Sequence, residues 1–155
     1  MFKKILIANR GEIALRLVRA VQDLGTRSVA VYAQDDARAL HVRQADEALA
    51  LDATGPAAYL DIARIIALAR QTGCDAVHPG YGFLSERADF AQACLDAGLV
   101  FIGPTVTQLA LFGDKARARA RAQECGVPLM PGSAGAVTLA QAQAFLAAQS
   151  GTAKR

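Results

Sequence analysis

The chain opens with a strand, a helix and a second strand, and this order restricts the possible folds more than any other feature of the sequence. Residues 3–8 and 28–33 are short, almost continuous apolar runs, which is the pattern of strands buried on both faces of a sheet. The segment between them, residues 12–24, has the length of a helix and ends at Gly25. Two strands joined in this way lie parallel in one sheet. The apolar face of the helix is predicted from helical spacing at Ile13, Leu17, Val21 and Leu24.

Strands and helices continue to alternate as far as residue 112. This order predicts an α/β fold with a doubly wound, mostly parallel sheet of the Rossmann type. Two helices without a strand follow Gly113, which divides the chain into an α/β domain, residues 1–112, and the incomplete start of a second, helical region, residues 113–155. We predict further strands at 48–51, 76–78 and 99–102, and further helices at 39–44, 59–72, 87–97, 105–112, 115–124 and 138–148.

Composition excludes several classes of protein. The 155 residues carry a net charge of +3, no apolar run is long enough to span a bilayer, and no secretory signal is visible at the start. The most basic segment, residues 115–121, has a cation at every second position, so a helix divides these charges between two faces. We expect a solvated helix there, with an anion-facing helix as the alternative, and neither nucleic acid nor a membrane as partner.

Three dispersed cysteines without zinc-binding spacing indicate a reducing cytoplasm: Cys74, Cys94 and Cys125.

An unusual turn, His78-Pro79-Gly80-Tyr81-Gly82, follows the predicted strand at residues 76–78. Two residues separate this turn from Ser85 and Glu86, the expected N-cap and first residue of a helix. The turn places an imidazole, a phenol and a carboxylate at the carboxyl end of a strand, where open parallel sheets bind ligands. Each side chain also has an ordinary explanation. His78 is either a base or a buried, hydrogen-bonded residue; Tyr81 either stacks on a flat ligand or packs; Glu86 either contacts a substrate or favours the helix dipole.

Two more turns that contain glycine fall at the ends of predicted strands, Asn9-Arg10-Gly11 and Gly103-Pro104. Because the carboxyl ends of parallel strands gather at one edge of a sheet, the three turns together favour a binding site there. The first turn lacks the Gly-x-Gly-x-x-Gly fingerprint, so a dinucleotide site is not expected. Lys115, after Gly113-Asp114, is either a surface lysine or a point charge for a phosphate, and no P-loop motif accompanies it.

Taken together, these motifs resemble biotin carboxylases. The segments that carry the resemblance occur in the family's order: residues 7–14 (Ile-Ala-Asn-Arg-Gly-Glu-Ile-Ala), 78–86, 101–104 (Phe-Ile-Gly-Pro) and 113–115 (Gly-Asp-Lys). The resemblance implies a Rossmann-like domain that precedes an ATP-grasp fold. It also implies an enzyme that activates bicarbonate with Mg-ATP to carboxyphosphate and then carboxylates biotin on a carrier protein. Acyl-CoA, pyruvate and urea carboxylases all contain such a part, and a separate carboxyltransferase selects the acceptor.

The resemblance implies roles for single residues. Lys115 matches a lysine that contacts the ATP phosphates, and Tyr81 and Gly82 match residues that line the biotin pocket. Glu86, with His78 nearby, matches an acid close to the reaction centre. The turn at Asn9 is implied to be architectural, and no metal ligand is expected in this chain, so the Mg²⁺ ligands lie outside it. The family's homodimer contact corresponds to Arg16, Arg19 and Asp23, for which a solvated helix face is the alternative.

Two departures from the family's pattern set further expectations. Arg87 stands where the family usually has asparagine, so we expect a cation beside Glu86 to alter the local hydrogen bonds. Residues 149–155 do not continue into the family's next strand, and the family's ATP lid, metal-binding glutamates and biotin-site arginine follow that strand. We therefore expect the isolated chain to be inactive. A non-catalytic dimerisation or interaction module is the alternative function, and an unrelated small-molecule binder is a third.

Overall fold

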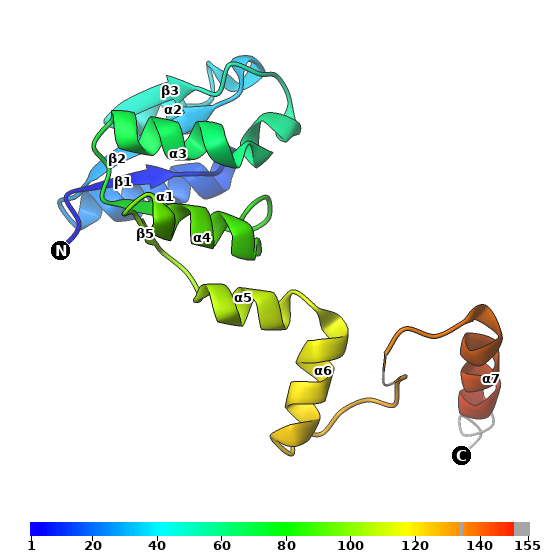
Figure 1. The fold of residues 1–155 in the computed structure, drawn as a ribbon. Helices are drawn as coiled ribbons and strands as arrows, with labels where there is room; N and C mark the ends of the chain where they lie inside the picture. The colour runs from blue at the N-terminus through cyan, green and yellow to red at the C-terminus, as the bar shows by residue number, and fades with distance from the viewer. Residues whose placement is uncertain (134, 151–155) are drawn as a thin grey trace. The chain divides into compact units, whose positions relative to one another are not determined.

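The computed structural model describes residues 1–133 and 135–150 (Figure 1). The chain divides into two compact units, Met1–Ala110 and Leu111–Arg155. Within the described residues, the first unit holds a sheet of five parallel strands in the order β3-β2-β1-β4-β5. The strands are β1 (Lys4–Ile7), β2 (Arg27–Tyr32), β3 (Glu47–Ala50), β4 (Ala76–His78) and β5 (Val100–Phe101).

Helices connect successive strands, which confirms the predicted doubly wound α/β fold. The first unit also contains two short 3₁₀ turns, η1 (Gln34–Asp36) and η2 (Pro56–Leu60). The helices that begin in this unit are α1 (Gly11–Asp23), α2 (Leu40–Gln44), α3 (Ile62–Gln71), α4 (Ala88–Asp96) and α5 (Val106–Phe112).

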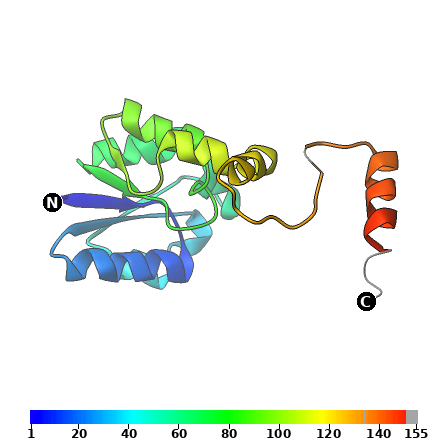
Figure 2. The same cartoon turned by 90° about the horizontal axis from the view of Figure 1, so that it is seen from below.

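Alternate residues of β1 supply the two faces of the core. Leu6 and Ala8 belong to a large cluster that includes side chains of α3 and α4, whereas Ile7 packs with Ala14 and Val18 of α1. Figure 2 shows the same arrangement, with the blue helix α1 on one face of the sheet and the green helices on the other. The central strand is therefore covered on both sides, as its continuous apolar sequence predicts.

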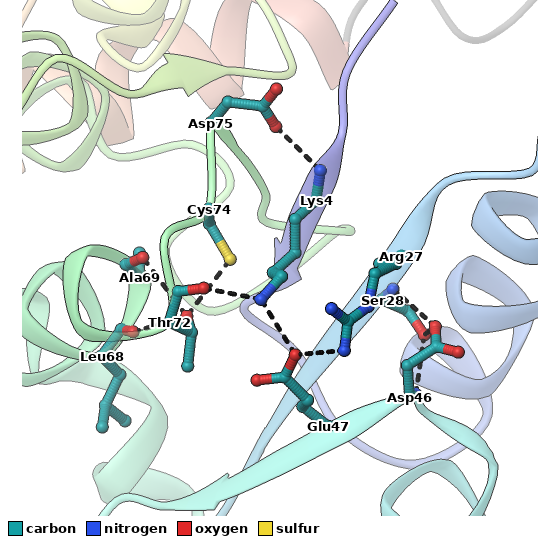
Figure 3. A network of polar contacts seen from close by, with 10 residues as sticks. All are labelled: Lys4, Arg27, Ser28, Asp46, Glu47, Leu68, Ala69, Thr72, Cys74 and Asp75. Atoms are coloured by element: carbon teal, nitrogen blue, oxygen red, sulfur yellow. Dashed lines mark hydrogen bonds and ion pairs between the residues drawn. The ribbon is translucent and has the colours of Figure 1, made fainter.

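A network of polar contacts ties the strands together at their amino ends (Figure 3). The ammonium of Lys4 donates to the carboxylate of Glu47 at 2.9 Å and to the carbonyl of Thr72 at 2.7 Å. The same carboxylate oxygen of Glu47 accepts a hydrogen bond from Arg27 at 2.7 Å. Asp75 accepts hydrogen bonds from the backbone N–H groups of residues 3 and 4. This network lies at the edge of the sheet opposite the glycine-containing turns, so it stabilises the scaffold and leaves the other edge free.

Two predicted apolar positions are wrong. Leu24 is 63% exposed, because it is the C-cap of α1. Of the other positions predicted for the apolar face of this helix, Val21 is buried, as predicted, whereas Ile13 and Leu17 are only partly buried. Ala14 and Val18 complete the buried face. Leu60 falls within the helix predicted over residues 59–72, on its expected apolar surface, but it lies in η2, before α3, and is 48% exposed.

The helix predicted from residue 59 starts only at Ile62. Asp61 accepts a hydrogen bond from the N–H of Arg64 at 2.9 Å and so caps α3. Pro56 at the start of η2 belongs to a separate turn. The glycines predicted to end the long helices do so: Gly25, Gly73 and Gly98 follow α1, α3 and α4 with positive φ.

The second unit contains α6 (Lys115–Glu124) and α7 (Leu139–Ser150). Their bounds agree closely with the helices predicted at 115–124 and 138–148. Asp114 caps α6 by accepting hydrogen bonds from the N–H groups of Ala116 and Arg117 at 2.9 and 3.1 Å. Thr138 and Gln141 cap the start of α7 reciprocally. Among the residues that the structure describes, no helix is long and apolar enough to cross a membrane.

Candidate functional site at the switch point of the sheet

The strand order reverses between β1 and β4. From β1 the chain builds β2 and β3 on one side, and it then returns to add β4 and β5 on the other. In open parallel sheets, ligands bind outside the carboxyl ends of the strands at such a switch point. The residues that follow these two strands here are Asn9–Gly11 and His78–Gly82. The structure therefore brings together two of the three turns that the sequence singled out.

The side chain of Asn9 connects the two turns. Its Nδ2 donates to the carbonyl of Pro79 at 2.8 Å and to that of Tyr81 at 2.9 Å. Its Oδ1 accepts a hydrogen bond from the N–H of Arg10 at 2.9 Å. Asn9 is 2% exposed, so these hydrogen bonds are shielded from water. The turn after β4 is thus fastened to the end of β1.

Glycine is required at residue 80 for two separate reasons. Its φ of 67° lies in the left-handed region. A Cβ atom there would also lie 2.7 Å from Nδ2 of Asn9 and 2.9 Å from Cγ2 of Ile13. Gly82 has a φ of 68° with open space around it, and Phe83 continues the left-handed path at 47°. After Gly82 the chain returns to the core, where Phe83 packs partly buried and Leu84 is buried.

His78 shapes the turn from inside. Its Nδ1 accepts a hydrogen bond from the N–H of Gly80 at 3.0 Å, which places the proton of the neutral ring on Nε2. Burial lowers the pKa of His78 below 6.5, so the ring is neutral near pH 7. The geometry favours the structural interpretation of this histidine over the catalytic one, because one ring nitrogen is occupied by the backbone and the other carries the proton.

The outer part of the turn is open to solvent. Tyr81 is 66% exposed, as the sequence predicts, and its hydroxyl lies 3.4 Å from Oε1 of Glu12 on α1. Gly82 and Glu86 are also exposed. The turn therefore presents a phenol, an unobstructed stretch of backbone and a carboxylate on one segment, supported from beneath by Asn9 and His78.

The predicted cap of the following helix is wrong. Helix α4 begins at Ala88 with Arg87 as its N-cap, and Ser85 lies in a turn in which its own N–H donates to the carbonyl of Gly82. The left-handed φ of Phe83 and a second turn from Leu84 to Arg87 delay the helix. Glu86 consequently lies before the helix rather than in its first turn, where Asp89 is the acidic residue.

The residues predicted for a subunit contact share one face of α1. Arg16, Arg19 and Asp23 are exposed and line a shallow depression of the helix surface together with Glu12, Leu15 and Ala20. Arg19 also contacts Oε1 of Gln44 at 3.4 Å. Three charged side chains on one exposed face are compatible with both explanations that the sequence left open.

Lys115 lies in the second unit, at the first turn of α6. It lines a depression of about 290 Å³ with Arg119 on the same helix face, next to Ser133 and Gly135. Arg119 also donates to the carbonyl of Met130 at 2.7 Å. The cations of Lys115 and Arg119 give this depression a positive charge that suits an anion such as phosphate.

Residues 1–109 match the family model described as "Biotin carboxylase, N-terminal domain". The chain belongs to this family. It is 48% identical over 141 residues to biotin carboxylase 1 of Bacillus subtilis, an alignment that covers 88% of this chain and 31% of the relative. The biotin carboxylase domain of a single-chain bacterial carboxylase has the same fold, with a TM-score of 0.92 and 60% identity over 96% of this chain and 35% of that one.

A second solved structure of a biotin carboxylase domain carries ligands. It is the domain dimer of 2-oxoglutarate carboxylase from Hydrogenobacter thermophilus, in complex with MgADP, ADP and bicarbonate. The two structures agree with a TM-score of 0.90 and 44% identity, over 96% of this chain and 33% of that one. The chain thus spans about a third of the length of these biotin carboxylases.

The departure from the biotin carboxylase pattern at residue 87 has a local explanation. The guanidinium of Arg87 is held by the carboxylate of Asp89, with Nε donating to Oδ1 at 2.9 Å and Nη2 pairing with Oδ2. Both side chains are about half exposed. The cation of Arg87 thus makes its local hydrogen bonds with Asp89, and its effect on Glu86 stays a prediction.

Sequence reasoning missed a cluster beside the switch point of this biotin carboxylase domain. Arg10 and Asp36 form an ion pair at 2.6 Å, and the guanidinium lies 5.7 Å from the ring centre of Tyr59. Burial works to raise the pKa of Asp36, but hydrogen bonds from Arg10 and Tyr59 outweigh it and hold the pKa below 3.8. The sequence places Arg10 after β1 and Asp36 after β2. Because β1 and β2 are neighbours in the sheet, this placement was the signal that could have predicted the ion pair.

Proposed function

We propose that this chain is the N-terminal part of an enzyme that carboxylates carrier-bound biotin, using Mg-ATP and bicarbonate. Bicarbonate is activated to carboxyphosphate, and the carboxyl group passes to N1′ of biotin. Residues 1–112 form the first domain in this proposal, and residues 113–155 begin the ATP-grasp region. The observation that carries the proposal is the turn after β4, with the family's motif in full, exposed at the switch point and fastened by Asn9.

The residues of this chain divide the work between the two units. Tyr81 and Gly82 line the biotin pocket with an exposed phenol and an unobstructed backbone, and Glu86 lies on the same exposed segment. Lys115 holds the ATP phosphates, supported by the neighbouring cation of Arg119. The ligands of Mg²⁺ are assigned to residues outside this chain. The structure in complex with MgADP and bicarbonate supports the choice of substrates through its 44% identity.

The full enzyme implied by this proposal has protein partners. A biotin carrier protein or domain delivers the substrate, and a carboxyltransferase uses the product. The free cysteines fit a cytoplasmic location, since Cys74 and Cys94 are buried and burial raises the pKa of Cys94 to about 11. These two thiols pack in the core.

ATP cleavage with bicarbonate and free biotin tests the proposal. We expect no activity from the 155-residue chain alone, and activity when a separately expressed remainder of a biotin carboxylase is added. The Lys115→Gln variant should raise the KM for ATP by about tenfold or more in the complemented system, because it removes the charge that meets phosphate. Arg117→Gln, with the same loss of charge on another face of α6, serves as the matched control. Activity of the isolated chain, or none after complementation, would refute the proposal.

An interaction module is the second candidate function, and the exposed charged face of α1 favours it. We propose that Arg16, Arg19 and Asp23 form the contact with a second copy of the chain. Sedimentation of the wild type should then show a dimer that Arg19→Glu weakens, whereas Arg38→Glu, at an exposed site off this helix, should have no effect. A wild-type chain that remains monomeric at all concentrations would rule out this contact in the isolated chain.

A further inference from the structure

Both N–H groups and the oxygen of the Asn9 side-chain amide form hydrogen bonds within the protein. The two N–H bonds of its amide go to two different carbonyl groups of the turn after β4, and its oxygen accepts the N–H of Arg10. With 2% of its surface exposed, it exchanges no partner with bulk water. A residue 70 positions earlier in the chain therefore fixes where Pro79 and Tyr81 lie.

Other hydrogen bonds hold the turn at its two ends: the N–H of Ala8 donates to the carbonyl of His78 at 2.9 Å, and the N–H of Ser85 donates to the carbonyl of Gly82 at 2.9 Å. Pro79 has no N–H, and the N–H of Gly80 is taken by Nδ1 of His78. The carbonyls of Pro79 and Tyr81 are the groups that face β1, and both receive their hydrogen bonds from Asn9. His78 thus holds the turn to its own strand, and Asn9 holds it to the neighbouring strand.

The fit between Asn9 and the turn is close. A single methyl group on Gly80 would meet Nδ2 of Asn9 at 2.7 Å, so the backbone of the turn lies directly on the amide. Aspartate has the same shape but would direct one carboxylate oxygen, in place of Nδ2, at the two carbonyl oxygens. Serine is too short to reach both carbonyls. Asparagine is therefore the side chain that combines the length and the two donors that this position uses.

We propose that Asn9 is a positioning residue for biotin: its amide sets the height of Tyr81 and Gly82 above the sheet, and so the shape of the pocket that receives the ureido ring. This inference rests on the proposed function, in which these two residues line the biotin pocket. Asn9 itself touches neither biotin nor ATP in this proposal. It acts through the backbone of the turn.

The test compares Asn9→Asp and Asn9→Ser with Ser28→Ala as a matched control. Ser28 is also a buried polar residue, but it bonds Asp46 at the opposite edge of the sheet. Steady-state kinetics of the complemented enzyme should show a KM for biotin raised about tenfold in both Asn9 variants, with the KM for ATP within about twofold of wild type. Ser28→Ala should leave both KM values unchanged.

Hydrogen exchange of the chain provides the second readout. Both Asn9 variants should speed exchange in residues 78–86 about tenfold, while exchange in α3 stays at the wild-type rate. Faster exchange throughout the first unit, or equal increases in both KM values, would overturn the inference, because Asn9 would then only stabilise the fold. An unchanged KM for biotin would overturn it as well. An inactive wild-type pair would refute the proposed function itself, before any variant is compared.

Discussion

The hydroxyl of Tyr59 donates a hydrogen bond to Oδ2 of Asp36 at 2.8 Å and accepts one from the N–H of Ala33 at 3.0 Å. Both Tyr59 and Ala33 have no exposed surface. Burial, together with the neighbouring carboxylate, raises the pKa of Tyr59 far above 10 and keeps the phenol protonated. One hydroxyl group thus joins η2, the end of β2 and the acid that holds Arg10.

Tyr59→Phe should lower the free energy of unfolding by about 1–3 kcal/mol, because a buried N–H loses its acceptor. Urea unfolding followed by circular dichroism measures this change. Tyr32→Phe is the control, since the described residues provide no hydrogen bond to the hydroxyl of Tyr32. Equal effects of the two substitutions would show that the hydroxyl of Tyr59 contributes nothing particular.

Gly80→Ala should destabilise the first unit more than Gly82→Ala. Both residues have nearly the same left-handed φ, so an alanine suffers about the same backbone strain at either position. Only the new methyl group at residue 80 collides with Asn9 and Ile13, and such overpacking typically costs about 1–3 kcal/mol. Thermal unfolding of the two variants gives the difference. A Gly82→Ala variant as unstable as Gly80→Ala would contradict the steric explanation.

Stability should decline on mild acidification. Burial lowers the pKa of both His41 and His78 below 6.5, so the unfolded chain takes up protons that the folded chain refuses. The stabilisation is complete above about pH 6.5 and is lost as the pH falls through the folded pKa values. A separate loss begins below pH 3.8, where depressed carboxylates such as Asp36 and Asp75 protonate.

The measurement for this pH effect is the urea midpoint at a series of pH values. The double variant His41→Phe, His78→Asn should flatten the curve between about pH 6.5 and 3.8, and should leave the loss at lower pH in place. Asparagine at residue 78 retains an acceptor for the N–H of Gly80. A wild-type midpoint that stays constant across that interval would contradict the assignment.

Arg87→Asn, which introduces the residue usual in the family, should leave the unfolding midpoint unchanged. The ion pair that it removes joins two half-exposed side chains separated by one residue, and such surface pairs contribute little. Asp89→Asn breaks the same pair from the other side and is the control. A marked stabilisation by Arg87→Asn would show that the cation is in fact unfavourable beside Glu86.

The strand and helix order of the first unit could be predicted because each strand is an apolar run and each long helix ends at a glycine. On α1, the burial of Val21 was predicted, but the burial of Ala14 and Val18 and the exposure of Leu24 were not, because spacing alone does not fix how the helix is rotated against the sheet. Ser85 was a plausible cap that failed because Phe83, a residue without special turn chemistry, adopts a positive φ. Local patterns cannot anticipate that conformation.

The candidate site also has parts that the sequence predicted and parts that it did not. The turn after β4 was visible from its glycines and proline, and the exposure of Tyr81 followed from them. The amide of Asn9 and the ion pair of Arg10 with Asp36 were not, because each joins residues separated by 26 or more positions. Contacts of this kind depend on which strands become neighbours, and this is decided by the strand order rather than by any local segment.

The position of β1 at the centre of the sheet has a consequence for the synthesis of the protein. This strand leaves the ribosome before its two neighbours, β2 follows soon after it, and β4 begins only at residue 76. Until then one edge of an apolar strand has no partner and can pair with another chain. The contacts of Asn9 and of Asp75 also wait for β4, so the second edge of β1 is covered and the turn after β4 is fastened at the same stage of synthesis.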